Sequence, residues 1–413
     1  MATIEAGRYS AAIWSAAIRE AAQVFSAYLT PLGYSLGSHA VRGVQDGETD
    51  LSTEVAARLD LGRANRVGEL LRRLDAELTV VYRHELVYSQ GFVRGKPHIP
   101  RYLQMLARGD RRGVPVIIAQ RQPTTPENLF VSETVRLSRL VCNAWMSRDS
   151  AERRLAIDLA DRLARFESSS PWSALRAHPR PALTDLSAIV GGRLISGAVN
   201  ETGAVAELHR LFSPREPENV IEFEEATEAL TFLACNDSRF EDKVFELIVL
   251  AWLFQALQSR ATAFQIDLRR LKGAGGEPVA TATLGDASVE VFFQAAASVL
   301  PPGAWRYRHS GAALRAIPDI VIRIRTQGAQ DRIVIVDAKN RTSASESEVI
   351  YKLLGYRENI RLTPYSAVGV YPSLEPHPRV LRLSDGTSRV TLVHVPLRGG
   401  RQVATRLVRA LSS

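Results

Sequence analysis

The sequence predicts an α/β protein of two domains, and three observations lead to that prediction. The chain has 413 residues, which is more than one typical domain holds. Hydrophobic residues make up 46% of the chain and charged residues 23%, the balance of an ordinary globular protein. In the second half, segments with strand periodicity alternate with segments of helical periodicity. We therefore expect a mixed, largely helical N-terminal domain over residues 1–225, for recognition or partner binding, and an α/β domain over residues 226–413.

The first half contains mostly amphipathic helical patterns. Apolar residues recur at helical spacing in three segments, and a short run of branched apolar residues that stops before Pro123 indicates a buried strand. A polar, proline-bearing stretch then reads as a connection. The expected helices are 61–78, a segment from Pro126 onward and 152–166; the strand is 113–122 and the connection 168–183.

The second half has a clear order of elements. It opens with a helix that is apolar nearly all round and is therefore expected to be buried. Three strand-like segments, a helix and further strand-like segments follow. The predicted core is thus a helix, a three-strand antiparallel meander, a second helix and a strand. The segments are the helix 237–259, strands starting at 288 and spanning 317–325 and 332–339, the helix 346–359, and strands 366–372 and 389–397.

Two neighbouring strands of this core are predicted to form a hairpin, and the register of that hairpin determines which charged residues lie opposite each other. The six-residue loop 326–331 is too short for a crossover helix, so the strands must be antiparallel. The even positions from Ile320 onward form one apolar face, and paired residues must share a face. A register that keeps this face intact sets Asp319 opposite Asp337. The odd positions hold the charged residues Asp319, Arg323, Arg325, Asp337 and Lys339.

Facing carboxylates repel each other unless a proton or a cation lies between them, and oxygen ligands suit Mg²⁺ or Mn²⁺. Lys339 follows Asp337 by two residues and could orient or deprotonate a water and help to neutralise a phosphate. Only five of the 52 basic residues are lysines, so a lysine here indicates a need that arginine does not meet. A salt bridge among charges at the strand ends is the alternative interpretation.

A third carboxylate is expected from the helix before the strands, and two residues compete for this role. Glu241 follows Ser238 at the spacing of a capping box, which gives it a structural explanation. Glu246 shares a helix face with apolar residues, where an ionised side chain is costly unless it meets a charged partner. We therefore favour Glu246 over Glu241.

These residues resemble a known family. A glutamate on a helix, Pro318-Asp319 on a strand and Asp337-Ala338-Lys339 on the next strand are similar to the PD-(D/E)XK nuclease superfamily, which implies a restriction-endonuclease-like core. The segments FEDKVFELIVLAW, IPDIVIRI, RIVIVDAKNR, YKLLGYREN and TPENLFV resemble the nuclease subunit of McrBC-type restriction systems and its uncharacterised bacterial relatives.

The resemblance implies roles for particular residues and a biological setting. Asp319, Asp337 and the backbone carbonyl of Ala338 would bind the metal, Glu246 would assist there, and Lys339 would serve the water. It also implies a metal-dependent endonuclease of bacterial antiviral defence that works on DNA. A separate motor ATPase is the implied partner, since the chain has no GxxxxGK[ST] loop of its own.

The charge distribution is consistent with a polyanionic partner. Residues 301–413 carry 18 basic residues against 8 acidic ones. Candidate nucleic-acid contacts are Arg323, Arg325, Arg341 and Lys352, with ordinary solvated side chains as the alternative. A non-cleaving nucleic-acid-binding subunit of a defence complex, or an RNase, remains a second interpretation of the same pattern.

The remaining features are unexceptional. The two cysteines, Cys142 and Cys235, have no metal-ligand spacing and read as core residues. No apolar run is long enough for a membrane span, and the N-terminus lacks a signal-peptide layout, so we expect a cytoplasmic protein that does not act at a membrane. The oligomeric state stays open, a homo-oligomer included.

Overall fold

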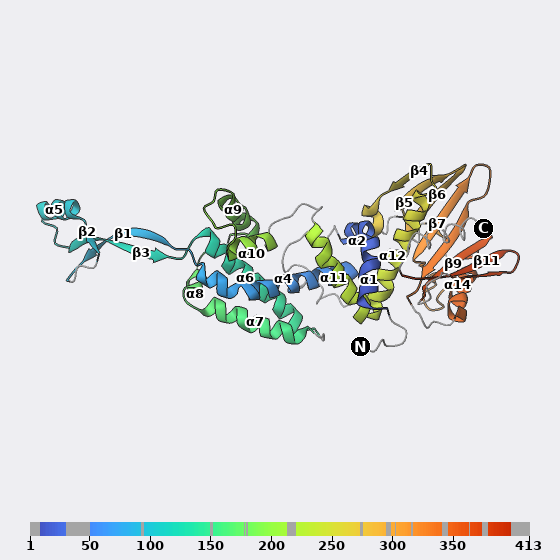
Figure 1. Ribbon diagram of the computed structural model, residues 1–413, viewed down its shortest axis with the longest axis horizontal. Helices are drawn as coiled ribbons and strands as arrows, with labels where there is room; N and C mark the ends of the chain where they lie inside the picture. The colour runs from blue at the N-terminus through green and yellow to red at the C-terminus, as the bar shows by residue number, and fades with distance from the viewer. Residues whose placement is uncertain are drawn as a thin grey trace. The chain divides into compact units, whose positions relative to one another are not determined.

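The computed structural model divides the chain into two compact units (Figure 1). The sheet unit consists of Met1–Gly33 and Pro217–Ser413, and the helical unit is Tyr34–Glu216. The division differs from the expected one, because the first 33 residues belong with the sheet unit rather than with the helical one. The structure describes residues 9–29, 50–91, 95–148, 152–176, 178, 181–212, 220–272, 276–294, 299–301, 303–314, 317–340, 346–362, 364–373 and 379–397.

The N-terminal segment joins the sheet unit through helix packing. Helix α1 (Ala11–Glu20) packs against α11 (Val220–Asn236) and α12 (Ser238–Gln258), and α2 (Ala22–Leu29) packs against α12. Apolar side chains such as Trp14 and Phe25 are fully buried by this packing. This packing could not be predicted from the sequence, because an amphipathic helix does not reveal which partner covers its apolar face.

The helical unit is built around one hydrophobic core. Its predicted helices are present, and the predicted connection 168–183 contains a short helix whose Trp172 is buried in that core. The helices are α4 (Leu51–Ala76), α6 (Pro126–Met146), α7 (Arg153–Ser168), α8 (Trp172–Leu175), α9 (Leu183–Ile195) and α10 (Ala204–Phe212).

A three-stranded sheet in the order β1-β3-β2 belongs to the same unit. The predicted strand 113–122 is β3 (Val114–Gln122), and it pairs antiparallel with β1 (Val81–Ser89) and with the short β2 (Lys96–Pro97). Helix α5 (Ile99–Ala107) packs against β3. Strand β1 is exposed or half-exposed along its whole length, so it lacks the alternation by which a half-buried strand is recognised.

The sheet unit holds an eight-stranded mixed sheet in the order β10-β11-β9-β8-β7-β6-β5-β4 (Figure 1). The predicted strands are present, and β4, β5 and β10 add to the edges. The strands are β4 (Ala263–Ile266), β5 (Ala280–Leu284), β6 (Ala287–Phe293), β7 (Ile320–Thr326), β8 (Arg332–Ala338), β9 (Tyr365–Pro372), β10 (Arg379–Ser384) and β11 (Ser388–Val395). The 3₁₀ helix η1 (Leu268–Lys272) lies between β4 and β5 in the chain.

The central part of this sheet has the predicted connectivity and register. Strands β6, β7 and β8 form an antiparallel meander, and β8 then pairs parallel with β9 after the crossover helix α14 (Glu346–Ile360). Ile320 pairs with Val336, so Asp319 and Asp337 end the two strands opposite each other, as predicted. Gly328 in the connecting turn has a φ of 77°, which glycine adopts without strain.

Helices cover both faces of the sheet. Val321 and Ile335, at odd positions, pack in one core cluster with Val349 and Leu353 of α14. Helix α12 packs against β4, β5 and β8 and covers the apolar even positions. The face expected to be charged at the odd positions is therefore only partly charged, because α14 covers Val321, between Asp319 and Arg323, and Ile335, two residues before Asp337. This burial places the carboxylates of the site in a low-dielectric environment.

Candidate functional site

The predicted carboxylates converge where β7 begins and β8 ends. Asp319 directly precedes β7 and is buried, and its Oδ2 accepts a hydrogen bond of 2.8 Å from the backbone N–H of Ala338. The Lys339 Nζ lies 4.0 Å from the same oxygen. Asp337, next to Ala338 on β8, is completely buried. The hairpin thus brings together the residues that the sequence predicted for it.

Asp337 is held by helix α14. The Lys352 Nζ donates a 2.6 Å hydrogen bond to Asp337 Oδ1, and the Tyr356 hydroxyl lies 3.4 Å from the same oxygen. Asp337 Oδ2 has no hydrogen-bond partner among the described residues. A fully buried carboxylate oxygen without a partner is costly and is rare in folded proteins. Lys352, which the sequence suggested as a nucleic-acid contact, is therefore an ion-pair partner of the site.

Glu246 reaches the site from helix α12 on the other side of the sheet. It is buried, and its Oε2 accepts hydrogen bonds from Lys243 Nζ at 3.2 Å and from Gln294 Nε2 at 3.0 Å. The charge of Glu246 acts on Asp319, where it helps to raise the pKa. Of the two competing glutamates, this one is placed by the structure beside Asp319.

The structure does not support the capping-box explanation for Glu241. Helix α12 begins at Ser238, and its N-cap is Asp237, whose side chain accepts a hydrogen bond from the Arg239 N–H. Ser238 is thus the first helical residue and not the cap. The S-x-x-E spacing therefore does not mark a capping box here, because an aspartate one residue earlier takes the cap position.

Gln294 was not identified from the sequence, although it links two of the carboxylate residues. Its side chain donates to Glu246, and its backbone N–H donates a 3.0 Å hydrogen bond to the Asp319 carbonyl. Its φ of 49° lies in the left-handed region, which is uncommon for a residue other than glycine. An exposed glutamine after a strand gives no sequence signal of such a position.

The electrostatics of the site follow from burial and crowding. Burial, followed by the charges of Glu246 and Asp337, raises the pKa of Asp319 to about 8. For Lys339, burial acts to lower the pKa, but the surrounding carboxylates of Asp319 and Asp337 outweigh it and the pKa is raised. In this charge state Lys339 is an ammonium at neutral pH. It can donate hydrogen bonds and offset charge, but it can act as a base only after losing its own proton, which neutralisation of the carboxylate charges would favour.

The carboxylate oxygens of the site are the kind of ligand that a divalent cation prefers, although the side chains as they stand do not surround an ion. Asp337 Oδ2 lacks a partner, and Asp319 is penalised for carrying a charge, so both would be stabilised by a cation between them. Within the described ranges, no three His, Cys, Asp or Glu side chains stand close enough to enclose an ion. Instead, a lysine ammonium group lies beside each of the carboxylates of Glu246, Asp319 and Asp337.

The arginines suggested as nucleic-acid contacts are engaged elsewhere. Arg323 donates to Glu290 at 2.6 Å, and Arg325 lies 3.3 Å from Asp331 and 3.7 Å from Glu290. Glu290 lies on the neighbouring strand β6 and Asp331 in the turn before β8, away from the strand ends that hold the carboxylates. Arg341 lies outside the described residues.

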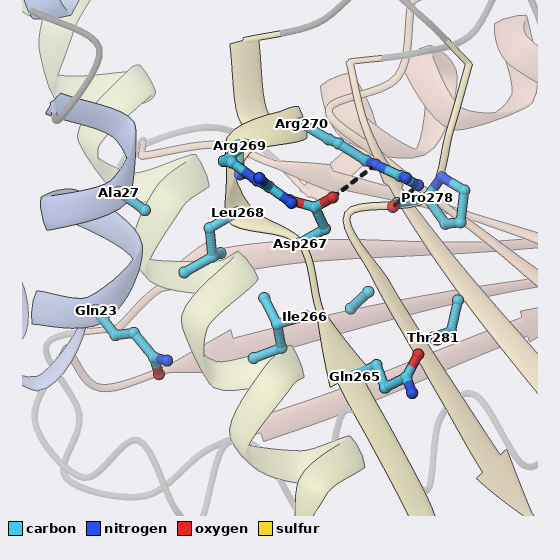
Figure 2. A pocket seen from close by; sticks show the side chains of 11 residues that line it. Gln23, Ala27, Gln265, Ile266, Asp267, Leu268, Arg269, Arg270, Pro278 and Thr281 are labelled. Carbon is cyan, nitrogen blue, oxygen red and sulfur yellow. Dashed lines mark hydrogen bonds and ion pairs between the residues drawn. The ribbon is translucent and has the colours of Figure 1, made fainter.

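A hollow in the sheet unit is separate from the carboxylates. It has a volume of about 900 Å³ and is lined by α2, η1 and the ends of β4 and β5. Figure 2 shows Arg270 turned toward Asp267, to which it forms an ion pair of 3.0 Å. None of the four predicted catalytic side chains lines this hollow. The charges of Asp267, Arg269 and Arg270 are paired within this hollow.

Comparisons with known proteins give little further information. No family model and no curated protein matches the chain. Among solved structures, a chain of an assembly of McrB AAA+ hexamers with bound McrC from Thermococcus gammatolerans matches at 16% identity, over 97% of this chain and 76% of that one, with a TM-score of 0.29. A TM-score of this size carries no argument about fold or function. No helix in the described part of the chain has the length and hydropathy to span a membrane.

Proposed function

We propose that the chain is a metal-dependent endonuclease that hydrolyses DNA phosphodiester bonds through a restriction-endonuclease-like core in the sheet unit. One observation carries the proposal. The buried carboxylates of Asp319 and Asp337 face each other beside Lys339 and Glu246, and one oxygen of Asp337 has no partner among the described residues. Structural ion pairs rarely leave a buried acceptor unused, whereas a cation site requires one.

The cation proposed is Mg²⁺ or Mn²⁺. Asp337 Oδ2, the Asp319 carboxylate and the Ala338 carbonyl would hold it, with Glu246 assisting from α12. When bound, such an ion lowers the pKa of a water that it ligates and offsets charge on an attacked phosphate.

The protein's own groups have separate tasks in this proposal. The Ala338 N–H fixes the orientation of the Asp319 carboxylate, and Gln294 holds Glu246 and the Asp319 backbone in one place. Lys339 offers an ammonium to the phosphate or to the water. If a cation neutralises the carboxylates that raise its pKa, burial is left as the opposing influence and favours loss of the proton.

The biological setting proposed is bacterial defence against foreign DNA beside a separate motor ATPase, and it rests on the resemblance of the site segments to McrBC-type nuclease subunits. A non-cleaving DNA-binding subunit and an RNase are the alternatives.

The proposal is tested with purified full-length protein and supercoiled plasmid. Mg²⁺ or Mn²⁺ should support nicking or cutting, and EDTA should abolish it. Parallel reactions with single-stranded DNA and with RNA identify the substrate class, and candidate ATPase partners are supplied in a further arm. If the protein binds DNA but cuts no nucleic acid in either metal, with or without partners, the binding interpretation replaces the enzymatic one.

A second measurement concerns binding alone. The basic excess in residues 301–413 should give DNA binding that weakens steeply between low and physiological salt, because neutralised phosphates release counterions. Affinity that does not change with salt would remove the electrostatic part of the proposal.

A further inference from the structure

The lysines of the chain are concentrated at the candidate site. Only five of the 52 basic residues are lysines. Three of these five each lie beside a different carboxylate of the site: Lys243 at 3.2 Å from Glu246, Lys339 at 4.0 Å from Asp319 and Lys352 at 2.6 Å from Asp337. In the other ion pairs of the described residues, the cation is an arginine. The pairing therefore has a requirement that lysine meets and arginine does not.

A comparison of the two cations indicates what that requirement is. An arginine grips a carboxylate with a planar fork and can occupy both of its oxygens, whereas a lysine is a point charge on a flexible stem and occupies one. Lys352 binds Asp337 Oδ1 and leaves Oδ2 without a partner. The Lys352 side chain is 38% exposed, so the ammonium has access to solvent into which it could withdraw.

We propose that Lys352 is a stand-in for the divalent cation: it compensates the buried charge of Asp337 while no metal is bound, and it competes with the metal for that carboxylate. The inference rests on the proposed function and deepens it. Without a counter-charge, an ionised Asp337 would be buried and unpaired, which destabilises a fold strongly. With both a dication and an ammonium on one carboxylate, the two cations repel each other at close range. Metal binding therefore displaces Lys352, and Lys352 sets how tightly the site holds metal.

The experiment measures Mn²⁺ affinity of the metal-free full-length chain by titration calorimetry, without DNA. Lys352→Met removes the competing charge, so its affinity for Mn²⁺ should be about tenfold tighter or more than that of the wild type. Lys352→Arg places a fork that can cover both oxygens of Asp337, so its affinity should be weaker than that of the wild type. Lys96→Met, which changes an exposed lysine of the helical unit, is the matched control and should leave the affinity unchanged.

Thermal unfolding of the same proteins provides a second readout. In EDTA, Lys352→Met should melt below the wild type, and Mn²⁺ should raise its melting temperature by more than it raises that of the wild type. If Lys352→Met does not fold, the comparison of Lys352→Arg with the wild type still decides the question.

The outcomes separate the inference from the proposed function. If the wild type cuts DNA but Lys352→Met binds Mn²⁺ equally or more weakly, Lys352 only positions Asp337 and the inference is overturned. If the predicted order of affinities is observed but no nucleic acid is cut, the inference stands and the proposed function falls. A wild-type chain that binds no Mn²⁺ overturns the inference as well.

Discussion

The two units of the molecule compensate their buried carboxylates in different ways. In the helical unit, buried glutamates pair with arginines: Glu54 with Arg58 and Arg148, Glu127 with Arg193, and Glu167 with Arg139 and Arg176. In the sheet unit, three buried carboxylates gather in one place and pair with lysines. The arginine pairs are spread over α4, α6 and α7, so each carboxylate is compensated separately.

An unpartnered oxygen alone does not distinguish the two units. Glu127 Oε2 also lacks a hydrogen-bond partner among the described residues, although Arg193 binds the other oxygen. What sets the sheet unit apart is that Asp319, Asp337 and Glu246 share one low-dielectric region, so that the pKa of Asp319 is raised to about 8, by burial first and then by its neighbours' charges. Crowded, buried carboxylates with a perturbed pKa indicate a functional site, and dispersed carboxylates paired with arginines indicate stability.

We expect the largest effect on cleavage from a substitution at Asp337, one of the crowded carboxylates of the sheet unit. Asp337→Asn keeps the shape of the side chain and removes its charge, so cleavage should fall by about 10³-fold or more, as expected when preorganised charge stabilisation is lost. Plasmid nicking under single-turnover conditions measures this loss. The fold should persist, because the amide can still accept a hydrogen bond from Lys352.

Glu127→Gln is the matched change in the helical unit. It neutralises an equally buried carboxylate with an arginine partner, so it should lower the free energy of unfolding by about 1–3 kcal/mol and leave cleavage within about twofold of wild type. Equal losses of cleavage in the two variants would show that the site has no special dependence on its own carboxylates.

A second prediction converts the site to the pairing used in the helical unit. Lys339→Arg keeps the positive charge but replaces a compact ammonium with a guanidinium that does not lose its proton at neutral pH. Cleavage should fall by about 10²-fold, the scale of general acid–base contributions, while DNA binding in EDTA stays unchanged. Lys339→Ala, compared in the same assay, should lose at least as much. Near wild-type cleavage by Lys339→Arg would mean that Lys339 supplies charge alone.

A third prediction concerns how the free energy of unfolding depends on pH through Asp319. The folded-state pKa of Asp319, about 8, lies above its ordinary value of 3.8, so between these values the folded chain holds a proton that the unfolded chain has lost. The contribution of Asp319 to stability in EDTA should therefore be greatest at low pH and fall as pH rises toward 8, by up to about 1.4 kcal/mol per pH unit. Chemical denaturation from pH 5 to pH 8 measures the slope.

Asp319→Asn is the control for that slope, since it removes the titrating group and leaves all others. The difference between the wild type and this variant isolates the contribution of Asp319. Mg²⁺ should abolish the decline in the wild type, because a cation compensates the ionised form. A wild-type slope that equals the slope of Asp319→Asn would contradict the electrostatic picture of the site.

The sequence predicted the part of the site that depends on local periodicity. The alternation of Ile320, Ile322 and Ile324 with charged residues fixed the register of the hairpin, because a slip by one residue would mix its two faces. Lys243 lies three residues before Glu246 on α12, and its pairing there was not predicted from the sequence. Gln294 escaped prediction, since its role depends on contacts with Glu246 and Asp319, both more than 20 positions away. The role of Lys352 escaped for the same reason: only the packing of α14 shows which carboxylate it meets.

The edge strands escaped prediction for a different reason. Strand β10 is half-buried or exposed along its length and pairs only with β11, so nothing forces its residues into an alternating pattern. Long-range packing, which no local window contains, likewise places α1 and α2 in the sheet unit.

The smallest expected effect concerns Arg323, which the sequence suggested as a phosphate contact. Its guanidinium is 2.6 Å from Glu290 and lies over the Phe292 ring at 5.1 Å, so its charge is already compensated within the sheet. Arg323→Gln should therefore change DNA affinity by less than about twofold and leave the salt dependence of binding unchanged. If Arg323 did contact a phosphate, its loss would reduce the salt dependence by about one released counterion. Arg323→Gln should instead lower the free energy of unfolding, by about 0.5–1.5 kcal/mol, because Glu290 keeps a half-buried charge without its closest partner.

Fluorescence anisotropy at several salt concentrations measures the binding, and chemical denaturation measures the stability, with Glu290→Gln as the partner variant in both. A clear fall in affinity and in salt dependence for Arg323→Gln, without a similar change in Glu290→Gln, would restore Arg323 as a nucleic-acid contact and show that arginine too serves function in the sheet unit.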